Sequence, residues 1–318
     1  MSLTIHSVTW QQRQQTLAAI RRKVFIDEQG VPESEEWDES DAAENTLHML
    51  VTLDSEAVAN ARVIQTANGS KIGRMCVLAK HRKKGVGLEL LKGLLQEVLL
   101  RIYTGQASQT IYLHAQTSAI GFYTRLAFEA QGELFDEAGI DHRKMLFDSN
   151  QRECLTALYQ DQVLRLNHQR EFAQHIFQMC SISRQNILIL SQNLSAKLFN
   201  AQVVEKLSAF ARYNRRAKIR ILIFDSSHLA SINAPLLYLT QRLPSSIEIR
   251  TLNEQVPNDE HAYVIYDAKH LVYFNDEENT QGFANYLAAG EAKRLVNEFT
   301  RWWDYESDVD PEHRELHL

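Results

Sequence analysis

The chain has 318 residues, a length typical of two domains at about 100 to 200 residues per domain. Hydrophobic residues make up 44% of it and charged residues 23%, which excludes the depleted, highly charged composition of a disordered chain. Lysine and arginine number 34 against 40 acidic residues, so the net charge of -6 argues against a basic, nucleic-acid-binding protein.

The sequence also bears on where the protein resides. No aliphatic stretch approaches the roughly 18 residues of a membrane span, and the N-terminus lacks the pattern of a secretory signal. We therefore expect a cytoplasmic protein with no membrane partner. Cys76, Cys154 and Cys180 are odd in number and widely spaced, so neither a disulfide framework nor a metal site is indicated.

Glycine usage divides the chain, because ten of the twelve glycines precede residue 150. The polar stretch 148–153 separates a short apolar run from a long glycine-poor region. We place the boundary there and expect two domains, 1–150 and 151–318.

The first half alternates helical and strand patterns. Apolar residues at three- and four-residue steps predict helices, and short apolar runs between turn residues predict strands. In chain order we expect a helix at 16–25, a turn-rich acidic loop at 29–41, strands at 47–53, 57–65 and 71–78, a helix at 86–99, a strand at 111–115, a helix at 117–126 and a strand at 143–147. This order predicts an α/β fold, a mixed sheet flanked by helices.

A basic loop, Arg82-Lys-Lys-Gly85-Val-Gly87, lies between a predicted strand and a predicted amphipathic helix. The free amides and the positive dipole end of a helix start favour a bound anion, and glycines permit its close approach. With a pyrophosphate bound there, the preceding strand is placed to pair with an extended, amide-containing arm such as pantetheine.

Together with the later run Ala119-Ile-Gly-Phe-Tyr123, this arrangement resembles the GNAT superfamily of acyl-CoA-dependent N-acyltransferases over roughly residues 3–148. The runs 24–32, 71–75, 114–116 and 137–142 look like a bacterial branch of that superfamily with few defined substrates. Ala127 stands where the family usually has glycine, which is tolerable unless the turn needs a positive φ.

The resemblance implies acetyl-CoA as cosubstrate, a primary amine as acceptor, and direct attack of the amine in a ternary complex, with no metal. It implies that Tyr123 is the general acid for the leaving thiolate, and that the amide of Val77 contacts the thioester carbonyl. The expected CoA-binding residues are the strand Met75, Cys76 and Val77 and the loop Arg82, Lys83, Lys84, Gly85, Val86 and Gly87.

A primary amine with a pKa near 10.4 must lose a proton before it attacks, so a base or a water relay is needed. The residue types leave Glu28, Asp38, Asp41 and His114 open for this role, and we name Glu28 with Tyr123 as catalytic residues. Six acids between residues 33 and 41 either attract a cationic amine or form a solvated face. Cys76 lies in an apolar strand, so we do not expect it to be a nucleophile.

The second half reads as another α/β layer. Helical patterns cover 155–180, 196–213 and 231–242, and strands are expected at 187–191, 218–225, 247–250, 262–266 and 271–274. The near-continuous apolar runs favour buried, parallel strands, with any site beyond their carboxyl ends near Ser191 and Asp225.

This half faintly resembles one half of a phospholipase D-like domain, with His261 before an apolar strand. The H-x-K-x-x-x-x-D pattern of that family is not intact, because Tyr263 replaces the lysine and Ala268 the aspartate. We therefore expect a non-catalytic domain that binds a partner, presents substrate or forms a homodimer.

Two hypotheses follow for the whole chain. In the first, it is an N-acetyltransferase acting on a small-molecule or peptide amine. In the second, it is a non-enzymatic acyl-CoA-binding sensor whose C-terminal domain engages a partner. The sequence does not identify the acceptor.

Overall fold

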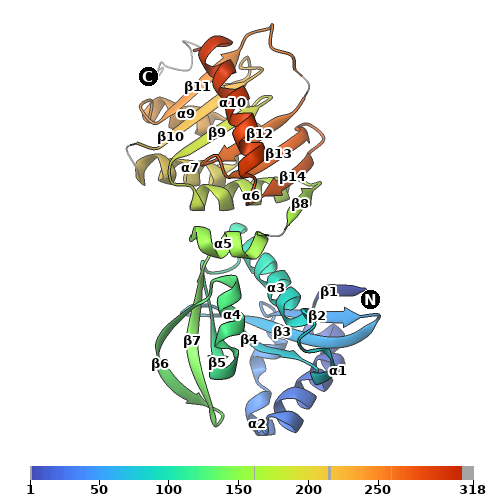
Figure 1. The fold of residues 1–318 in the computed structure, drawn as a ribbon. Coiled ribbons are helices and arrows are strands. Elements are labelled where there is room, and N and C mark those ends of the chain that lie inside the picture. The colour runs from blue at the N-terminus through green and yellow to red at the C-terminus, as the bar shows by residue number, and fades with distance from the viewer. Residues whose placement is uncertain (1, 161, 214–215, 259, 310–318) are drawn as a thin grey trace. The chain divides into compact units, whose positions relative to one another are not determined.

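The computed structural model describes residues 2–160, 162–213, 216–258 and 260–309. The chain divides into two compact units, residues 1–149 and 150–318 (Figure 1). Each unit has a sheet of its own. Among the described helices, none combines the length and apolar composition that a membrane span would need.

The first unit is built on a sheet that has seven strands in the described residues, in the order β1-β2-β3-β4-β5-β7-β6. The strands are β1 (Leu3–Val8), β2 (Leu47–Leu53), β3 (Glu56–Thr66), β4 (Gly69–Val77), β5 (Thr110–Gln116), β6 (Glu129–Glu137) and β7 (Ile140–Asp148). All neighbouring pairs are antiparallel except β4 and β5, which run parallel. The predicted α/β class with a mixed sheet is confirmed.

Strands β4 and β5 pair over only three residues and then separate. Their last pair joins Ile72 to Leu113, so residues 73–77 have no β5 partner in the described chain. Just past this point the register of β4 against β3 shifts, so that Ala61 faces both Arg74 and Met75, and Arg74 has φ +50°. This bulge bends β4 and accompanies its departure from β5.

Two long helices cover opposite faces of this sheet. The helices are α1 (Trp10–Arg21), α2 (Glu33–Glu36), α3 (Val86–Tyr103) and α4 (Ile120–Tyr123), and a π-helical segment (Arg22–Glu28) continues α1. Leu17 of α1 packs in a cluster with Leu50, whereas Gly93 of α3 lies against Met49. Since adjacent strand residues point to opposite faces, α1 and α3 sandwich the sheet.

Several elements differ from the sequence-based expectation. Helix α1 begins at Trp10 rather than near Thr16, because Thr9 and Gln12 form a capping box. Strands β1 and β6 were not predicted; β6 is an edge strand exposed along most of its length, so it lacks the apolar alternation that reveals a strand. The helix expected at 117–126 is a chain of short turns around α4.

The second unit contains a sheet of eight described strands in the order β15-β11-β10-β9-β12-β13-β14-β8. They are β8 (Val163–Leu166), β9 (Asn186–Ser191), β10 (Lys218–Ile223), β11 (Ile247–Leu252), β12 (Ala262–Tyr266), β13 (His270–Asp276), β14 (Gln281–Asn285) and β15 (Ser307–Asp308). Only β9, β10 and β11 are parallel, so the expectation of a parallel sheet is wrong for the rest. A tight turn at Asp267 and Ala268, both at positive φ, makes β12 and β13 a hairpin.

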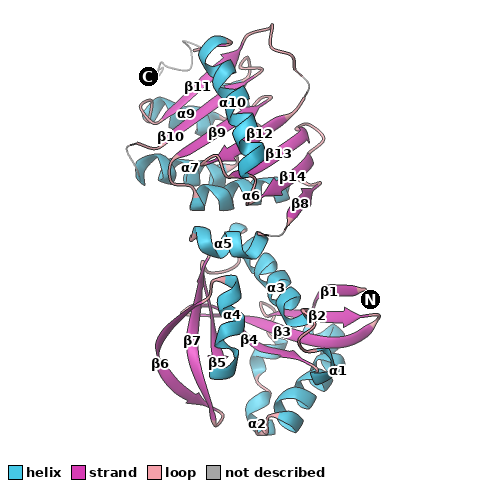
Figure 2. Ribbon diagram, in the orientation of Figure 1, coloured by secondary structure: helices cyan, strands magenta, loops and turns pink. Residues whose placement is uncertain are grey.

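Helices lie on both faces of this second sheet (Figure 2). The helices of the second unit are α5 (Arg152–Tyr159), α6 (Gln169–Ile182), α7 (Ala201–Tyr213), α8 (Leu229–Ile232), α9 (Ala234–Arg242) and α10 (Ala289–Tyr305). Phe299 and Trp302 of α10 pack in one buried cluster with Tyr263, whereas Phe172 of α6 stacks on Phe274 from the other side. The single helical pattern expected at 155–180 is in fact α5, β8 and α6.

Ala127 settles a point that the sequence left open. Its φ is 58° and its ψ is 27°, so the turn before Phe128 does require the left-handed conformation that suits glycine. An alanine in this region is strained by about 1 to 2 kcal/mol. A glycine at this position would remove that strain, but it would also stabilise the unfolded chain by about 0.4 to 1 kcal/mol through added conformational entropy.

We therefore expect Ala127→Gly to raise the free energy of unfolding of the first unit by several tenths to about 1 kcal/mol. Hydrogen exchange of the β5 and β7 amides in the full chain measures this free energy of unfolding. Ala18→Gly, in the interior of α1, should lower stability by about 1 kcal/mol. Equal destabilisation by both substitutions would contradict the assignment of strain to Ala127.

Candidate functional site

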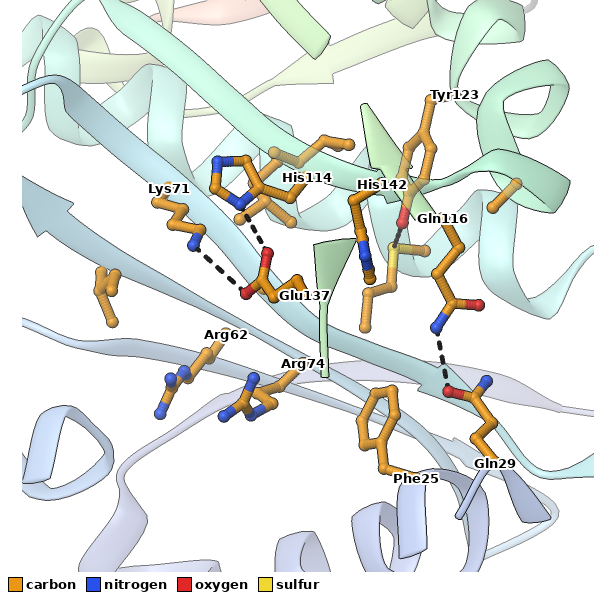
Figure 3. Close-up of a pocket in the computed structure, with 16 residues that line it drawn as sticks. Phe25, Gln29, Arg62, Lys71, Arg74, His114, Gln116, Tyr123, Glu137 and His142 are labelled. Atoms are coloured by element: carbon orange, nitrogen blue, oxygen red, sulfur yellow. Dashed lines mark hydrogen bonds and ion pairs between the residues drawn. The ribbon is translucent and has the colours of Figure 1, made fainter. Parts of the chain in front are cut away.

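A pocket of about 180 Å³ opens where β4 leaves β5, and Figure 3 shows its lining. Met75 from β4 and Tyr123 from α4 line one part of it. Lys71 from β4, His114 from β5 and Glu137 from β6 line another. The pocket therefore joins the separated strand ends to the β6–β7 hairpin.

Tyr123 lies against β4, as its assignment to the site requires. Its hydroxyl donates to the sulfur of Met75 at 3.7 Å, and its ring packs edge-on against Phe122 and Phe128. Burial raises the pKa of Tyr123 to about 12. The phenol is therefore protonated at neutral pH and has a proton to donate, and the raised pKa makes it a weaker acid than an exposed tyrosine.

The basic loop at residues 82–87 leads into α3 with a conformation that exposes its amides. Lys83 has φ +60° and Gly85 has φ +83°, and such alternation turns successive N–H groups toward one concave side. The amides of residues 83–87 have no acceptor among the described residues, while those of Leu88 and Glu89 already bond to the Gly85 carbonyl. This conformation is compatible with the anion-binding helix start that the sequence predicts.

The loop also adjoins the end of β4. A methyl group added at Gly87 would lie 3.5 Å from a methyl of Val77 and 3.6 Å from the ring of Phe122. An anion on the loop and an extended chain along residues 75–77 would thus be neighbours.

Arg82 and Glu28 form an ion pair instead of facing the pocket. The two guanidinium Nη atoms of Arg82 lie 2.7 and 2.6 Å from the carboxylate oxygens of Glu28, and its Nε donates to the Val77 carbonyl at 2.9 Å. The hydrogen bonds from Arg82 lower the pKa of Glu28, which makes this carboxylate a weaker base. These contacts fasten the π-helical segment to the end of β4.

The acids of residues 33–41 do not form a free acidic face. Glu36 and Asp41 are 1% and 3% exposed. Asp41 Oδ1 accepts from Arg21 at 2.7 Å and from Arg62 at 2.6 Å.

The same network takes in Asp38 and Arg74. Arg62 Nη2 lies 2.5 Å from Asp38, and Arg74 Nε lies 3.1 Å from Glu36 Oε2. Glu36, Asp38 and Asp41 are thus ion-pair partners of arginines, which is neither of the two alternatives that the sequence left open for the acidic stretch. Asp38 and Asp41 are held as ion-pair partners and do not line the pocket.

His114 is the one of the four candidate bases that lines the pocket. Its Nδ1 lies 2.8 Å from Glu137 Oε2, and Lys71 Nζ lies 3.9 Å from Glu137 Oε1. The hydrogen bond with His114, together with the charge of Lys71, lowers the pKa of Glu137 to about 2. A carboxylate that holds one nitrogen of an imidazole leaves the other nitrogen to accept a proton.

Glu137 and His142 were not named as site residues from the sequence, although both lie in the run 137–142 that carried part of the family resemblance. Only the β6–β7 hairpin brings them to β5: His142 pairs in register with Gln116. Because β6 itself was not predicted, no local signal placed them at the pocket.

Cys76 is buried, and its thiol lies 3.3 Å from Asn60 Oδ1. Burial raises the pKa of its thiol to about 12, which disfavours the nucleophilic thiolate. In the described part of the chain, no group of three or more His, Cys, Asp or Glu side chains is arranged to hold a metal ion.

The residues singled out in the second half have structural partners. Ser191 donates to buried Glu277 at 2.7 Å, and Asp225 accepts from Ser227. His261 lies 3.5 Å from Glu298, and Tyr263, at the lysine position of the phospholipase D pattern, is fully buried. These contacts tie strand ends to one another and to α10.

Comparison with known proteins separates the two halves. A family model described as acetyltransferase (GNAT) domain matches residues 11–148, and one described as domain of unknown function (DUF7931) matches residues 168–316. The phospholipase D-like resemblance of the second half has no counterpart in these matches and stays a prediction.

The first half of this chain matches relatives over most of their length. The uncharacterized N-acetyltransferase YjcF of Bacillus subtilis is 34% identical over 131 residues, 41% of this chain and 88% of that protein. The uncharacterized protein YyaT of Bacillus subtilis is 38% identical over 125 residues, 39% of this chain and 80% of that protein. The crystal structure of Escherichia coli ElaA is 24% identical, covers 46% of this chain and 99% of its own, and gives a TM-score of 0.41.

The family model and the near full-length relatives agree on one assignment for the first unit, in which the pocket and the basic loop lie. Through this N-terminal domain, the chain belongs to the GNAT family of acetyltransferases.

Proposed function

We propose that the N-terminal domain transfers an acetyl group from acetyl-CoA to a primary amine, by direct attack in a ternary complex in the cytoplasm. The separation of β4 from β5 after Ile72 carries this proposal. It leaves residues 75–77, which pair with β3 on one edge, without a β5 partner on the other edge in the described chain, between the basic loop and Tyr123. An extended thioester substrate would occupy that gap.

The basic loop at residues 82–87 and the strand end at residues 75–77 would bind the CoA moiety. The amides of residues 83–87 and the ammonium groups of Lys83 and Lys84 would bind the pyrophosphate, since they combine a helix start with positive charge. The backbone of Met75, Cys76 and Val77 would pair with the pantetheine arm. Arg82 would act on this geometry indirectly, by holding the Val77 carbonyl and Glu28.

The chemical step removes two protons from the ammonium group and supplies one to the thiolate. One ammonium proton passes to the free nitrogen of His114, the neutral amine nitrogen then forms a bond to the thioester carbon, and the carbonyl oxygen gathers negative charge near the Val77 amide. As the carbonyl re-forms, the C–S bond breaks and the thiolate takes the proton of the Tyr123 hydroxyl. The second proton leaves the nitrogen of the new amide and restores the phenol through water. Glu28, which the sequence suggested as catalytic, serves in this proposal as the partner of Arg82.

The assay uses the full chain with acetyl-CoA and a panel of primary amines, with thiol release as the readout. Tyr123→Phe should lower kcat about a hundredfold, the usual contribution of a general acid, and leave the Kd for CoA unchanged. Tyr112→Phe, whose hydroxyl bonds to Thr66 away from the pocket, is the matched control. CoA binding by the wild type without thiol release to any amine would instead favour the sensor hypothesis.

Gly85 tests the basic loop. Alanine at φ +83° is strained by about 1 to 2 kcal/mol. The unliganded loop of the variant would therefore adopt another backbone conformation, and CoA binding would have to restore the strained one. Gly85→Ala should therefore weaken CoA binding about tenfold in a calorimetric titration. Gly105→Ala, at φ +73° beyond the other end of α3 and equally free of neighbours, carries the same strain and should bind CoA normally. Equal loss in both variants would count against the loop as the phosphate site.

His114 tests the base. At pH 7 an amine with a pKa near 10.4 is almost fully protonated, whereas near pH 10 much of it is neutral without help. His114→Gln should therefore lower kcat/KM about a hundredfold at pH 7 and by much less at pH 10. His6→Gln, an exposed imidazole near Thr52, is the control. A loss of the same size at both pH values would show that His114 has only a structural role.

A further inference from the structure

The lining of the pocket carries more cationic than acidic side chains. It contains three cationic side chains, Arg62, Lys71 and Arg74, and a single carboxylate, Glu137. None of the six acids of residues 33–41 lines it, so the acidic loop places no carboxylate there to attract a polyamine-like cation.

Not all of this charge is available to a ligand. Arg62 is held by Asp38 and Asp41, and Arg74 donates to the carbonyl oxygens of Glu35 and Glu36. These two guanidinium groups belong to the ion-pair network behind the pocket.

Lys71 differs from the two arginines. Its nearest carboxylate oxygen, on Glu137, lies 3.9 Å away, which is too far for a hydrogen bond. No acceptor for its ammonium group exists among the described residues, although the side chain is only 25% exposed. Glu137 is itself engaged at 2.8 Å by His114. Lys71 thus presents donors that a bound anion would satisfy.

The position of Lys71 sets where that anion would lie. Lys71 precedes Met75 by four residues on β4. At roughly 3.3 Å per residue, the Cα atoms of the two residues are about 13 Å apart, not counting the lengths of the side chains. Figure 3 shows Lys71 beside Glu137 and away from the Tyr123 hydroxyl. An amine at the Tyr123 end and an anion at Lys71 must therefore be several bonds apart in one molecule. A pocket of about 180 Å³ suits a small molecule of this kind.

We propose that the acceptor is a small amine bearing a carboxylate several bonds from its nitrogen, and that Lys71 binds that carboxylate. This inference rests on the proposed acetyl transfer. It makes Lys71 a specificity-determining residue.

Three acceptors of matched length test the proposal with the full chain and acetyl-CoA: 5-aminopentanoate, its amide, and 1,5-diaminopentane. We expect kcat/KM to be at least tenfold higher for the carboxylate than for the amide, and lowest for the diamine. Lys71→Met should reduce the ratio of carboxylate to amide about tenfold, and Lys71→Arg should restore most of it. Lys80→Met, at a 62% exposed side chain paired with Glu56, should keep the ratio of the wild type.

The outcomes separate the two proposals. Thiol release that is equal for the three acceptors, or highest for the diamine, overturns the carboxylate preference and leaves the transferase intact. An unchanged ratio in Lys71→Met overturns the role of Lys71. The absence of thiol release from every amine, with CoA still bound, overturns the transferase and this inference with it.

Discussion

The parting of β4 from β5 is the constraint on which the rest of the N-terminal domain depends. A parallel pair that continued to the ends of both strands would leave no room for a ligand and no unpaired backbone to recognise one. The bulge at Arg74 accompanies the separation of the two strands, and the side chain of this non-glycine residue at φ +50° is held by hydrogen bonds. Arg74 bonds to the Glu35 and Glu36 carbonyls and to the Glu36 carboxylate, so the buried ion pairs of the acidic loop support the open strand end.

The sequence indicated those parts of the candidate site that lie within one local segment. The basic loop with its glycines, the strand 75–77 and Tyr123 each carry a signal in a few consecutive residues. The structure places the loop, the strand end and the tyrosine together, with Tyr123 3.7 Å from Met75. Alanine at position 127 shows the limit of the same approach, since only the structure reveals that its turn is left-handed.

Contacts between distant segments could not be predicted. Glu28 and Arg82 are 54 residues apart, and neither local pattern indicates that the two side chains pair with each other. Glu137 reaches His114 through a hairpin whose outer strand is too exposed to show apolar alternation. In the second domain, the apolar runs indicated buried strands correctly. Whether neighbouring strands run parallel or antiparallel depends on turns such as Asp267-Ala268, and this turn carries no glycine that would mark it in the sequence.

The π-helical segment has a consequence for how wide the opening between the strands can become. At its end, Glu28 is tied through Arg82 to the last residue of β4, while Gln29 accepts from Gln116, the last residue of β5, at 3.0 Å. Residues 28 and 29 thus bridge the ends of β4 and β5 across the opening between the two strands. The same segment carries Phe25, which lines the pocket, so a change in the separation of the two strand ends would be transmitted through covalent connection to the pocket wall.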